Sequence, residues 1–350
     1  MLVILVLATL AGAFAYSMKV ETTLARNSDY ESELEWLGRS GVELARYVIS
    51  QKCPGQENVE ALNQKWAGGV SGCSNDASGL SLENNVLGAG TFSVKIIDLE
   101  RKANINMAEP LFLQNIDLLQ RAMVDIMGAD PSLALTVRDS IFDWIDKNDD
   151  NHLSGAESDY YLGLDPPYLP KNGPMDDISE LLLIKGVSEN PEIYWGSAST
   201  NHSAPAFQSR GNRPFDDPLR PSYPIGLVDI FTTVSNGKIN LNTASTTTLQ
   251  MIPGVDEGIA SGIIKLRSGV DGVDGTEDDT PLTQAGDLRE VPGLTQVTAS
   301  QIAKNCGVKS STFEVQVDVQ LGNVKRQYFA VIRRSNNKPG DFAVLKFYWK

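Results

Sequence analysis

The sequence predicts an α+β fold, in which a long N-terminal helix packs on an antiparallel sheet and a large, mainly helical domain is inserted into that sheet. Residues 1–50 form one helix-compatible segment, residues 88–100 and 312–350 alternate like strands, and the residues between them have helical spacing. The predicted division is a membrane helix and stalk over 1–50, the start of the α+β domain over 51–103, the inserted helical domain over 104–310, and closing strands over 311–350.

The N-terminus has the properties of a membrane tether. Residues 1–18 carry no charge, and as a helix they would span about 27 Å, near the lower limit for crossing a bilayer. The first basic residue, Lys19, follows the apolar run, whereas a secretory signal peptide carries its basic residues ahead of it. Either a basic leader has been removed, which makes Met1 a processed terminus, or none existed. We expect a single-pass anchor.

Behind the anchor, the helix has one apolar stripe. Apolar positions recur at spacings of four and three, which places them on one face of a helix. These positions are Tyr30, Leu34, Leu37, Gly41, Leu44 and Val48. We expect this stripe to lie on the antiparallel sheet, with residues 88–100 as a partner strand of the C-terminal meander.

Composition limits the function. The 44 acidic and 30 basic residues give a net charge of -14, which repels nucleic acid and anionic lipid head groups and suits cation or protein partners. Only two histidines occur, His152 and His202, so a zinc site built on several histidines is excluded, and no Gly-rich phosphate loop is present. The sequence therefore predicts a protein that is not an enzyme.

The three cysteines allow two readings. Cys53 and Cys73 bracket a Gly/Asn/Ser-rich stretch, and in an oxidising compartment a disulfide between them would contribute about 3 kcal/mol by closing a loop. The alternative is a pair of free cysteines, which are commonly buried. We predict the disulfide, and we predict that Cys306 is a small core residue.

The most specific motif follows a predicted helix that begins at Asp130-Pro131 with a capping acid and a proline in the first turn. The segment 146–157 reads DKNDDNHLSGAE, and its oxygen ligands fall at positions 1, 3, 5, 9 and 12 of a calcium loop, with a backbone carbonyl at position 7. The predicted calcium ligands are Asp146, Asn148, Asp150, the carbonyl of His152, Ser154 and Glu157. Position 6 is Asn151 instead of Gly, and prolines follow too soon for a complete EF-hand. The alternative is an acidic surface loop that binds nothing.

A second acidic cluster also has two interpretations. Its carboxylates are dense enough to repel one another unless they are solvated or neutralised by a cation. They are Asp271, Asp274, Glu277, Asp278 and Asp279. A second calcium site and an ordinary solvated loop both fit this pattern.

Residues 249–264 are typical of a helix-hairpin-helix unit, with weaker copies at 288–302 and 178–187. Such hairpins often bind DNA phosphates through backbone N–H groups and nearby basic residues. Here Asp256 and Glu257 would place two carboxylates against the phosphate. We therefore interpret the hairpins as a packing module, with no nucleic acid as partner, and keep a membrane-tethered DNA receptor as the alternative.

Four stretches together resemble the K-type minor pseudopilins of the bacterial type II secretion system. They are INMAEP at 105–110, the stretch 143–168 that begins DWIDKNDD and ends GAESDYYLGLDPPY, DISELLLIKGV at 177–187 and GKINLNTAS at 237–245. The resemblance implies a pilin-like fold, an inserted domain of SAM-like hairpin units, calcium bound in that domain, and a structural role at the tip of the pseudopilus in protein export.

The resemblance also implies partners and location. These are the I-type and J-type minor pseudopilins, the major pseudopilin, the inner-membrane secretion platform, and a prepilin peptidase that cleaves before the apolar helix and leaves a methylated N-terminus. Most pilins carry Glu at mature position 5, but this chain has Leu5, which suits a tip position with no subunit above. The implied location is the inner membrane, single pass, with the bulk of the chain in the periplasm of a Gram-negative-type bacterium.

Overall fold

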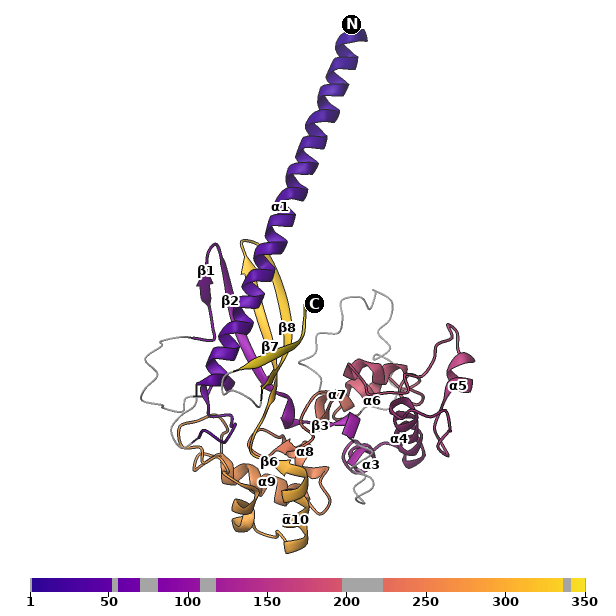
Figure 1. Cartoon of the computed structure of the whole chain (residues 1–350), viewed down its shortest axis with the longest axis vertical. Coiled ribbons are helices and arrows are strands. Elements are labelled where there is room, and N and C mark those ends of the chain that lie inside the picture. The colour runs from indigo at the N-terminus through magenta and orange to yellow at the C-terminus, as the bar shows by residue number, and fades with distance from the viewer. Residues whose placement is uncertain are drawn as a thin grey trace.

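The computed structural model describes residues 2–51, 56–69, 81–107, 118–196, 223–335 and 341–349. Helix α1 is a single helix of 49 residues, Leu2–Ser50. Its N-terminal half projects away from the rest of the chain, and its C-terminal half lies on the sheet (Figure 1). Within the described residues no helix is both long and apolar enough to cross a membrane, and the membrane helix over 1–18 stays a prediction.

Five antiparallel strands form the main sheet, in the order β1-β2-β7-β8-β9. The sheet confirms the predicted pairing, because β2 lies beside the first strand of the C-terminal meander, with Asp98 opposite Phe313. The strands are β1 (Asn85–Leu87), β2 (Gly90–Asp98), β7 (Thr312–Leu321), β8 (Val324–Arg334) and β9 (Phe342–Trp349).

The stripe on α1 and the alternation in the strands meet in one core. Leu34 and Leu37 of α1 are buried together with every second residue of β2 and β7, including Phe92 and Val317. Tyr30 is the exception in the predicted stripe, 38% exposed, and it lies one turn before Leu34, the first residue of the stripe that is buried. The helix–sheet packing therefore follows from two local patterns: the period of 3.6 that places apolar residues on one face of α1, and the period of 2 that places them on one face of each strand.

The chain leaves the sheet after β2 and returns at β7, and the residues between form the helical part. Its elements are η2 (Leu99–Arg101), β3 (Ala103–Asn104), η3 (Ile105–Met107), α3 (Leu118–Arg121), the π-helix η4 (Ala122–Ile126), α4 (Pro131–Ile145), α5 (Ser158–Leu162), η5 (Ile178–Leu183), α6 (Glu192–Trp195), α7 (Leu227–Ile230), β4 (Phe231–Thr232), β5 (Ile239–Asn240), α8 (Thr246–Gln250), α9 (Glu257–Arg267), η7 (Ala285–Glu290), α10 (Gln296–Asn305) and β6 (Cys306–Gly307). A short 3-10 turn, η1 (Lys65–Ala67), precedes the sheet.

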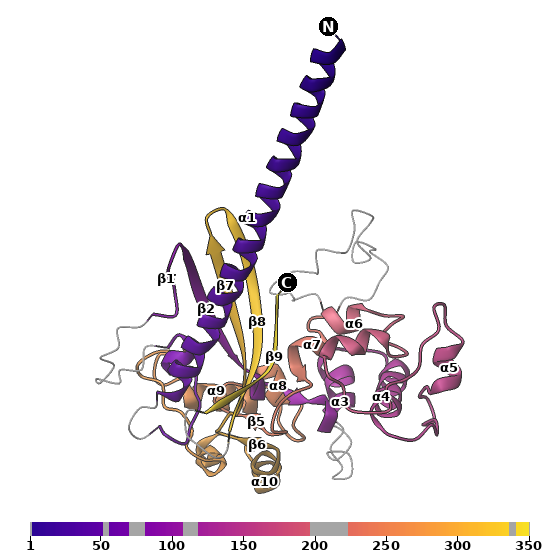
Figure 2. The ribbon, with the colours of Figure 1, turned by 45° about the horizontal axis from the view of Figure 1, so that its top comes forward.

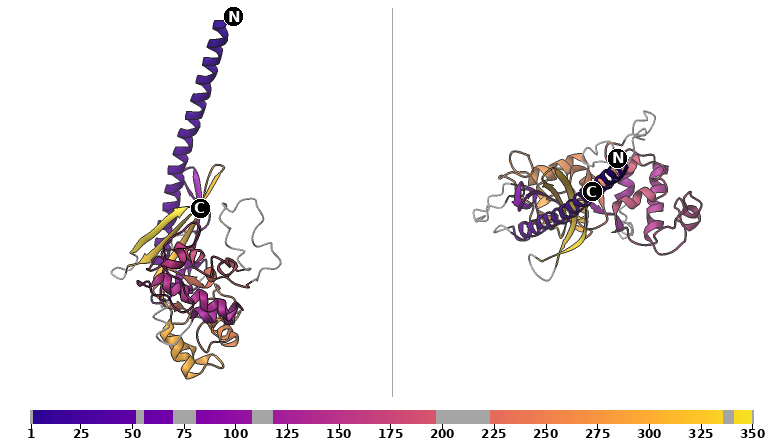
Figure 3. Two further views of the ribbon diagram at one scale, coloured as in Figure 1. Left: turned by 90° about the vertical axis from the view of Figure 1, so that its right-hand side faces the viewer. Right: turned by 90° about the horizontal axis from the view of Figure 1, so that it is seen from above.

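The helical part has its own hydrophobic core, separate from the core under α1. Elements α3 to α7 lie to one side of the sheet, and α8 to α10 lie beneath it (Figures 2 and 3). Two short parallel pairs join distant segments of the helical part. Strand β3, which follows β2 and η2, pairs with β4, and β5 pairs with β6, which follows α10. Cys306 is 2% exposed in this core, as predicted, and burial raises the pKa of its thiol to about 12.

Candidate functional site

The end of α4 carries the candidate metal centre. Asp130 caps this helix by accepting hydrogen bonds from the N–H groups of Ser132 and Leu133, with Pro131 in the first turn, as the sequence predicts. The helix ends at Ile145, one residue before the predicted calcium loop. This short distance brings a carboxylate of the last helical turn, Asp143, into the loop.

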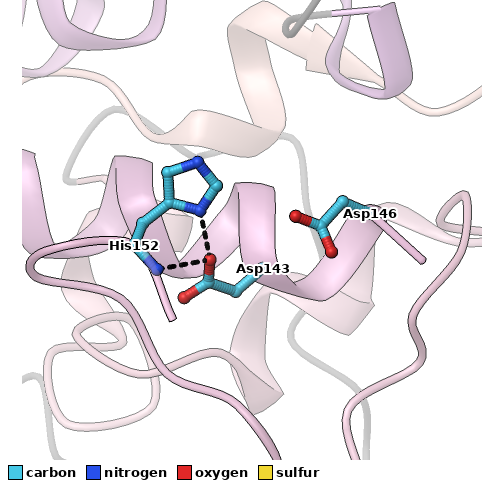
Figure 4. A group of neighbouring side chains, drawn as sticks. All are labelled: Asp143, Asp146 and His152. Carbon is cyan, nitrogen blue, oxygen red and sulfur yellow. Dashed lines mark hydrogen bonds and ion pairs between the residues drawn. The ribbon is translucent and has the colours of Figure 1, made fainter. Parts of the chain in front are cut away.

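Asp143 contacts the predicted calcium loop through His152. It is fully buried, and its Oδ1 accepts a hydrogen bond of 3.1 Å from the backbone N–H of His152 and contacts the His152 ring Nδ1 (Figure 4). Ligand atoms of Asp143, Asp146 and His152 all lie within 4.8 Å of one another. The other oxygen of Asp143 is buried, and no group in the described part of the chain donates a hydrogen bond to it.

Glu157 has the strongest need for a cation among the predicted ligands. It is 1% exposed, and both of its carboxylate oxygens are buried without a hydrogen-bond partner among the described residues. Burial, and then the charges of Asp143, Asp146 and Asp149, raise the pKa of Glu157 to about 7. A buried carboxylate without partners is costly unless it is neutralised or coordinated, so this group fits a hard divalent cation.

Gly155 shows how closely the loop approaches Asp143. A Cβ at position 155 would lie 1.8 Å from Asp143 Oδ2, so only glycine fits there without a shift of that carboxylate. The glycine thus keeps the unpartnered oxygen of Asp143 inside the loop. Burial also raises the pKa of Asp146, with the Asp143 charge acting in the same direction.

The structure distributes the predicted calcium ligands unevenly. Asp146 and His152 belong to the cluster, but the His152 carbonyl accepts a hydrogen bond from the Gly155 N–H, and it is the His152 side chain that faces Asp143. Asn148 and Asp150 are exposed, with Asn148 Oδ1 accepting from the Asp150 N–H. The Ser154 N–H donates to Asp139, another buried acid of α4.

Asp143 is the site residue that reasoning from the loop spacing missed. It lies three residues before position 1 of the motif, inside a helix that reads as apolar. The available signal was its spacing of four from Asp139, because two acidic residues on the buried face of one helix require a counter-charge or donors. Both are less than 5% exposed.

In the second acidic cluster, one carboxylate pairs with a buried arginine and three others lie together. Arg267, 4% exposed, donates to both carboxylate oxygens of Asp274, at 2.9 and 2.7 Å. Ligand atoms of Asp271, Asp278 and Asp279 lie within 4.8 Å of one another, and Glu277 is exposed outside that group. Asp278 already accepts hydrogen bonds from the N–H groups of Val270 and Asp271 and from the Thr276 hydroxyl.

The hairpins pack against each other. Gly254, in the turn between α8 and α9, has positive φ and would place a Cβ 2.8 Å from Thr298 Oγ1 of α10, while Gly262 of α9 faces Val291. Asp256 caps α9 by accepting a 2.8 Å hydrogen bond from the Ile259 N–H. That carboxylate occupies the position at which a DNA-binding hairpin would offer N–H groups to phosphate.

Three predicted positions have side chains beyond the described part of the structure. Cys53 and Cys73 lie outside the described residues, and so does the environment of the Leu5 side chain, although Leu5 itself falls within α1.

Comparisons with known proteins agree with the resemblance. Residues 104–193 match the family model described as Type II secretion system (T2SS), protein K, and residues 234–306 match the helix-hairpin-helix motif. The chain is 28% identical over 200 residues to type II secretion system protein K of Aeromonas hydrophila, covering 54% of this chain and 57% of that protein. It is 35% identical over 65 residues to the protein K of Klebsiella pneumoniae, covering 19% and 20%. Each match spans less than two thirds of its relative.

The fold also has a counterpart among solved structures. A chain in the crystal structure of the GspK-GspI-GspJ complex from the enterotoxigenic Escherichia coli type 2 secretion system superposes with a TM-score of 0.65. The match covers 93% of this chain and 99% of that chain at 18% identity. The resemblance to the type II secretion protein K family is thereby confirmed, and so is the pair of hairpins.

Proposed function

We propose that this chain is a structural minor pseudopilin of a type II secretion system, located at the tip of the pseudopilus and acting in protein export without catalysis. The observation that carries this proposal is the family match to residues 104–193, which lies within a fold matched along 93% of the chain. The two comparisons support different parts of the proposal, because one uses the sequence of the helical part and the other uses the fold of the whole chain.

The proposed partners are the I-type and J-type minor pseudopilins, with the major pseudopilin and the inner-membrane platform beyond them. The structurally similar Escherichia coli chain was solved in a GspK-GspI-GspJ complex, which supports the first two partners. A tip position agrees with Leu5, because a subunit with no neighbour above it has no amine to neutralise. The helical part adds bulk beside and beneath the sheet (Figure 2), as suits a terminal subunit.

The proposed location is the bacterial envelope, with residues 1–18 as a single inner-membrane anchor and the sheet and helical part in the periplasm. The uncharged run supports this anchor. The projecting half of α1 exposes apolar side chains such as Val3, Leu7 and Phe14, each at least 60% exposed, and these favour a lipid or helical environment. Processing by a prepilin peptidase belongs to the same proposal.

We further propose calcium at the end of α4, held by Asp143, Asp146 and Glu157 with help from the loop. The three unpartnered buried oxygens, one from Asp143 and two from Glu157, support this assignment, because calcium takes six to eight oxygen ligands and tolerates irregular geometry. Bound calcium would supply a structural counter-charge. The second predicted site stays a prediction for Asp271, Asp278 and Asp279, since Arg267 already neutralises Asp274.

The alternative function, a tethered DNA receptor, has less support. The Asp256 cap and the exposed Glu257 beside it present negative charge at the hairpin turn. The second hairpin is capped by the Thr295 hydroxyl, which accepts from the Thr298 N–H. Neither turn offers the basic contacts on which non-specific DNA affinity depends.

The full chain in detergent, mixed with the I-type and J-type proteins of the same genome, tests the proposal by the mass of the complex in light scattering. We expect a 1:1:1 complex that calcium stabilises. The Asp143→Asn variant should weaken the calcium effect, and Glu277→Gln, an exposed acid outside both groups, should not. Absence of any complex, together with salt-sensitive retention on DNA, would favour the receptor.

A further inference from the structure

Three buried carboxylates lie where the chain passes between the sheet and the helical part. They belong to Glu60, in the segment before η1, to Asp98, at the end of β2, and to Glu100, in η2. All three residues are at most 2% exposed. Carboxylates are rarely buried unless they are paired or hydrogen-bonded, so their partners show what this cluster holds together.

Asp98 joins three segments that are remote in sequence. Its Oδ2 accepts hydrogen bonds from Ser310 Oγ at 2.6 Å, Thr243 Oγ1 at 2.6 Å and Asn240 Nδ2 at 3.1 Å. Its Oδ1 accepts from the Glu100 N–H at 2.8 Å. One carboxylate thus links the strand that leaves the sheet with the hairpin region and with the returning chain.

Glu100 and Glu60 hold the returning chain by its backbone. Glu100 accepts from the N–H groups of Ser311 and Thr312, at 2.7 and 3.1 Å, and from the Asn236 N–H at 3.2 Å. The Ser310 N–H donates to Glu60 at 2.9 Å. Three successive amides, from Ser310 to Thr312 at the start of β7, therefore donate to these two glutamates.

Basic residues also lie around the cluster. Arg334 of β8 pairs with Glu60 at 2.7 Å. Arg101 of η2 lies near Asp98, and burial lowers the pKa of this arginine while the Asp98 charge raises it; Arg267 and Asp274 act on it with opposite signs. Lys102 donates to the Val228 carbonyl, and burial lowers its pKa, with Asp229 and Glu314 acting in the opposite direction.

The surroundings of Glu100 change the pKa of its carboxyl group. Burial, and then the charge of Asp98, raise its pKa from 4.5 to about 7, against the hydrogen bonds from Thr312 and Ser311, which lower it. Burial likewise raises the pKa of Asp98, although all four of its hydrogen bonds lower it. When both acids are ionised they repel each other inside the junction, and protonation of either one removes the repulsion.

We infer that Glu60, Asp98 and Glu100 form a protonation-controlled clamp that fixes the helical part to the sheet, tight when Glu100 is protonated and looser when it is ionised. Because the folded-state pKa of Glu100 is raised, the stabilisation is complete below its ordinary pKa of 4.5 and is lost as the pH rises through about 7. The clamp is independent of the proposed calcium site.

Amide hydrogen exchange of the full chain tests the inference, with rates corrected for the intrinsic effect of pH. The peptides to follow contain Ser310, Ser311 and Thr312, whose N–H groups end on the clamp. Opening should increase about tenfold from pH 6 to pH 8.5, because the closed state binds its proton with a pKa of about 7 and the open state with the ordinary value of 4.5.

Two variants and one control make the test specific. Glu100→Gln should remove the tenfold increase in opening that Glu100 supplies between pH 6 and pH 8.5, and Asp98→Asn should move the midpoint to lower pH by removing the repelling charge. Glu314→Gln, on β7 outside the clamp, should keep the wild-type dependence. Equal protection at pH 6 and 8.5 in the wild-type chain, or an unchanged pH dependence in Glu100→Gln, would overturn the inference.

Discussion

Gly41 of α1 lies directly against Val317 of β7, so that a Cβ on Gly41 would come within 2.4 Å of Val317 Cγ1. Val317 is fully buried, and its branched side chain has no open space to enter. The glycine is thus what allows the helix to approach the sheet closely, and the same holds for Gly38, whose Cβ would lie 2.7 Å from the Tyr328 ring.

We predict that Gly41→Ala destabilises the fold, although alanine favours a helix. Overpacking a well-filled core costs about 1–3 kcal/mol, and the gain in helix propensity is at most about 1 kcal/mol. The free energy of unfolding, measured in urea, should fall. Ser40→Ala is the matched control, because it also introduces an alanine into α1, at the neighbouring position, where the side chain is only half-buried. Equal stability of the two variants would contradict the close contact.

Calcium should stabilise the chain through Asp143. At a concentration one hundred times its dissociation constant, a ligand of the folded state adds about 2.7 kcal/mol, so a chelator should lower the melting temperature. Asp143→Asn should abolish this calcium effect and, without calcium, leave stability equal or higher, because it removes one of several buried like charges. The measurement is thermal unfolding with and without calcium.

Asp125→Asn provides the control for that series, because Asp125 is an exposed acid on η4 at 3.9 Å from Arg121. It should change stability by no more than about 0.5 kcal/mol and keep the calcium effect. Gly155→Ala should act like Asp143→Asn, since the added methyl group displaces the Asp143 carboxylate. A calcium response that survives both changes would place the ion elsewhere.

Asp274→Asn should destabilise the hairpin region whether or not calcium is present. The change removes the negative charge and one of the two oxygens that accept from the buried Arg267 guanidinium, whose other acceptors are the carbonyls of Leu241 and Ala244. Hydrogen bonds to charged groups contribute about 1.5–3 kcal/mol, and we expect a loss in this range by urea unfolding. Glu277→Gln removes an exposed charge of the same loop and should have little effect. A loss seen only with calcium present would instead make Asp274 a ligand.

Asp256→Ala separates the packing role of the hairpins from a DNA role. Loss of this N-cap should cost about 1 kcal/mol without producing retention on DNA at low salt. Glu257→Gln removes an equal charge without removing the cap, so its stability should stay near the wild-type value. Strong DNA retention by Asp256→Ala would show that the hairpin had only been masked.

The sheet and the α1 stripe were predictable because each follows from a local period. Alternation over residues 90–98 and 312–321 identifies two strands that are far apart in sequence, and Leu34 and Leu37 identify the helix face that covers them. In the helical part, the Asp130-Pro131 start of α4 and the hairpin turns were visible for the same reason, because caps and turns are encoded within a few residues.

The candidate site was predictable only in part. The loop spacing identified Asp146 and Glu157, but Asp143 was hidden in the preceding helix, and Asn148 and Asp150 are exposed. The clamp could not be predicted at all. Its three acids and the amides of Ser310, Ser311 and Thr312 meet only through tertiary folding, and no local pattern marks two segments that are so far apart in the chain.

The pairing of Asp98 with Phe313 has a mechanical consequence. Because the helical part begins and ends at neighbouring points of the sheet, a force applied along α1 passes into the sheet through the helix–sheet core and does not stretch the helical part. If the proposed pseudopilus pushes along its axis, the helical part would move with α1 and the sheet without bearing the load. Changes in the shape of the helical part would then leave force transmission through α1 and the sheet unaltered.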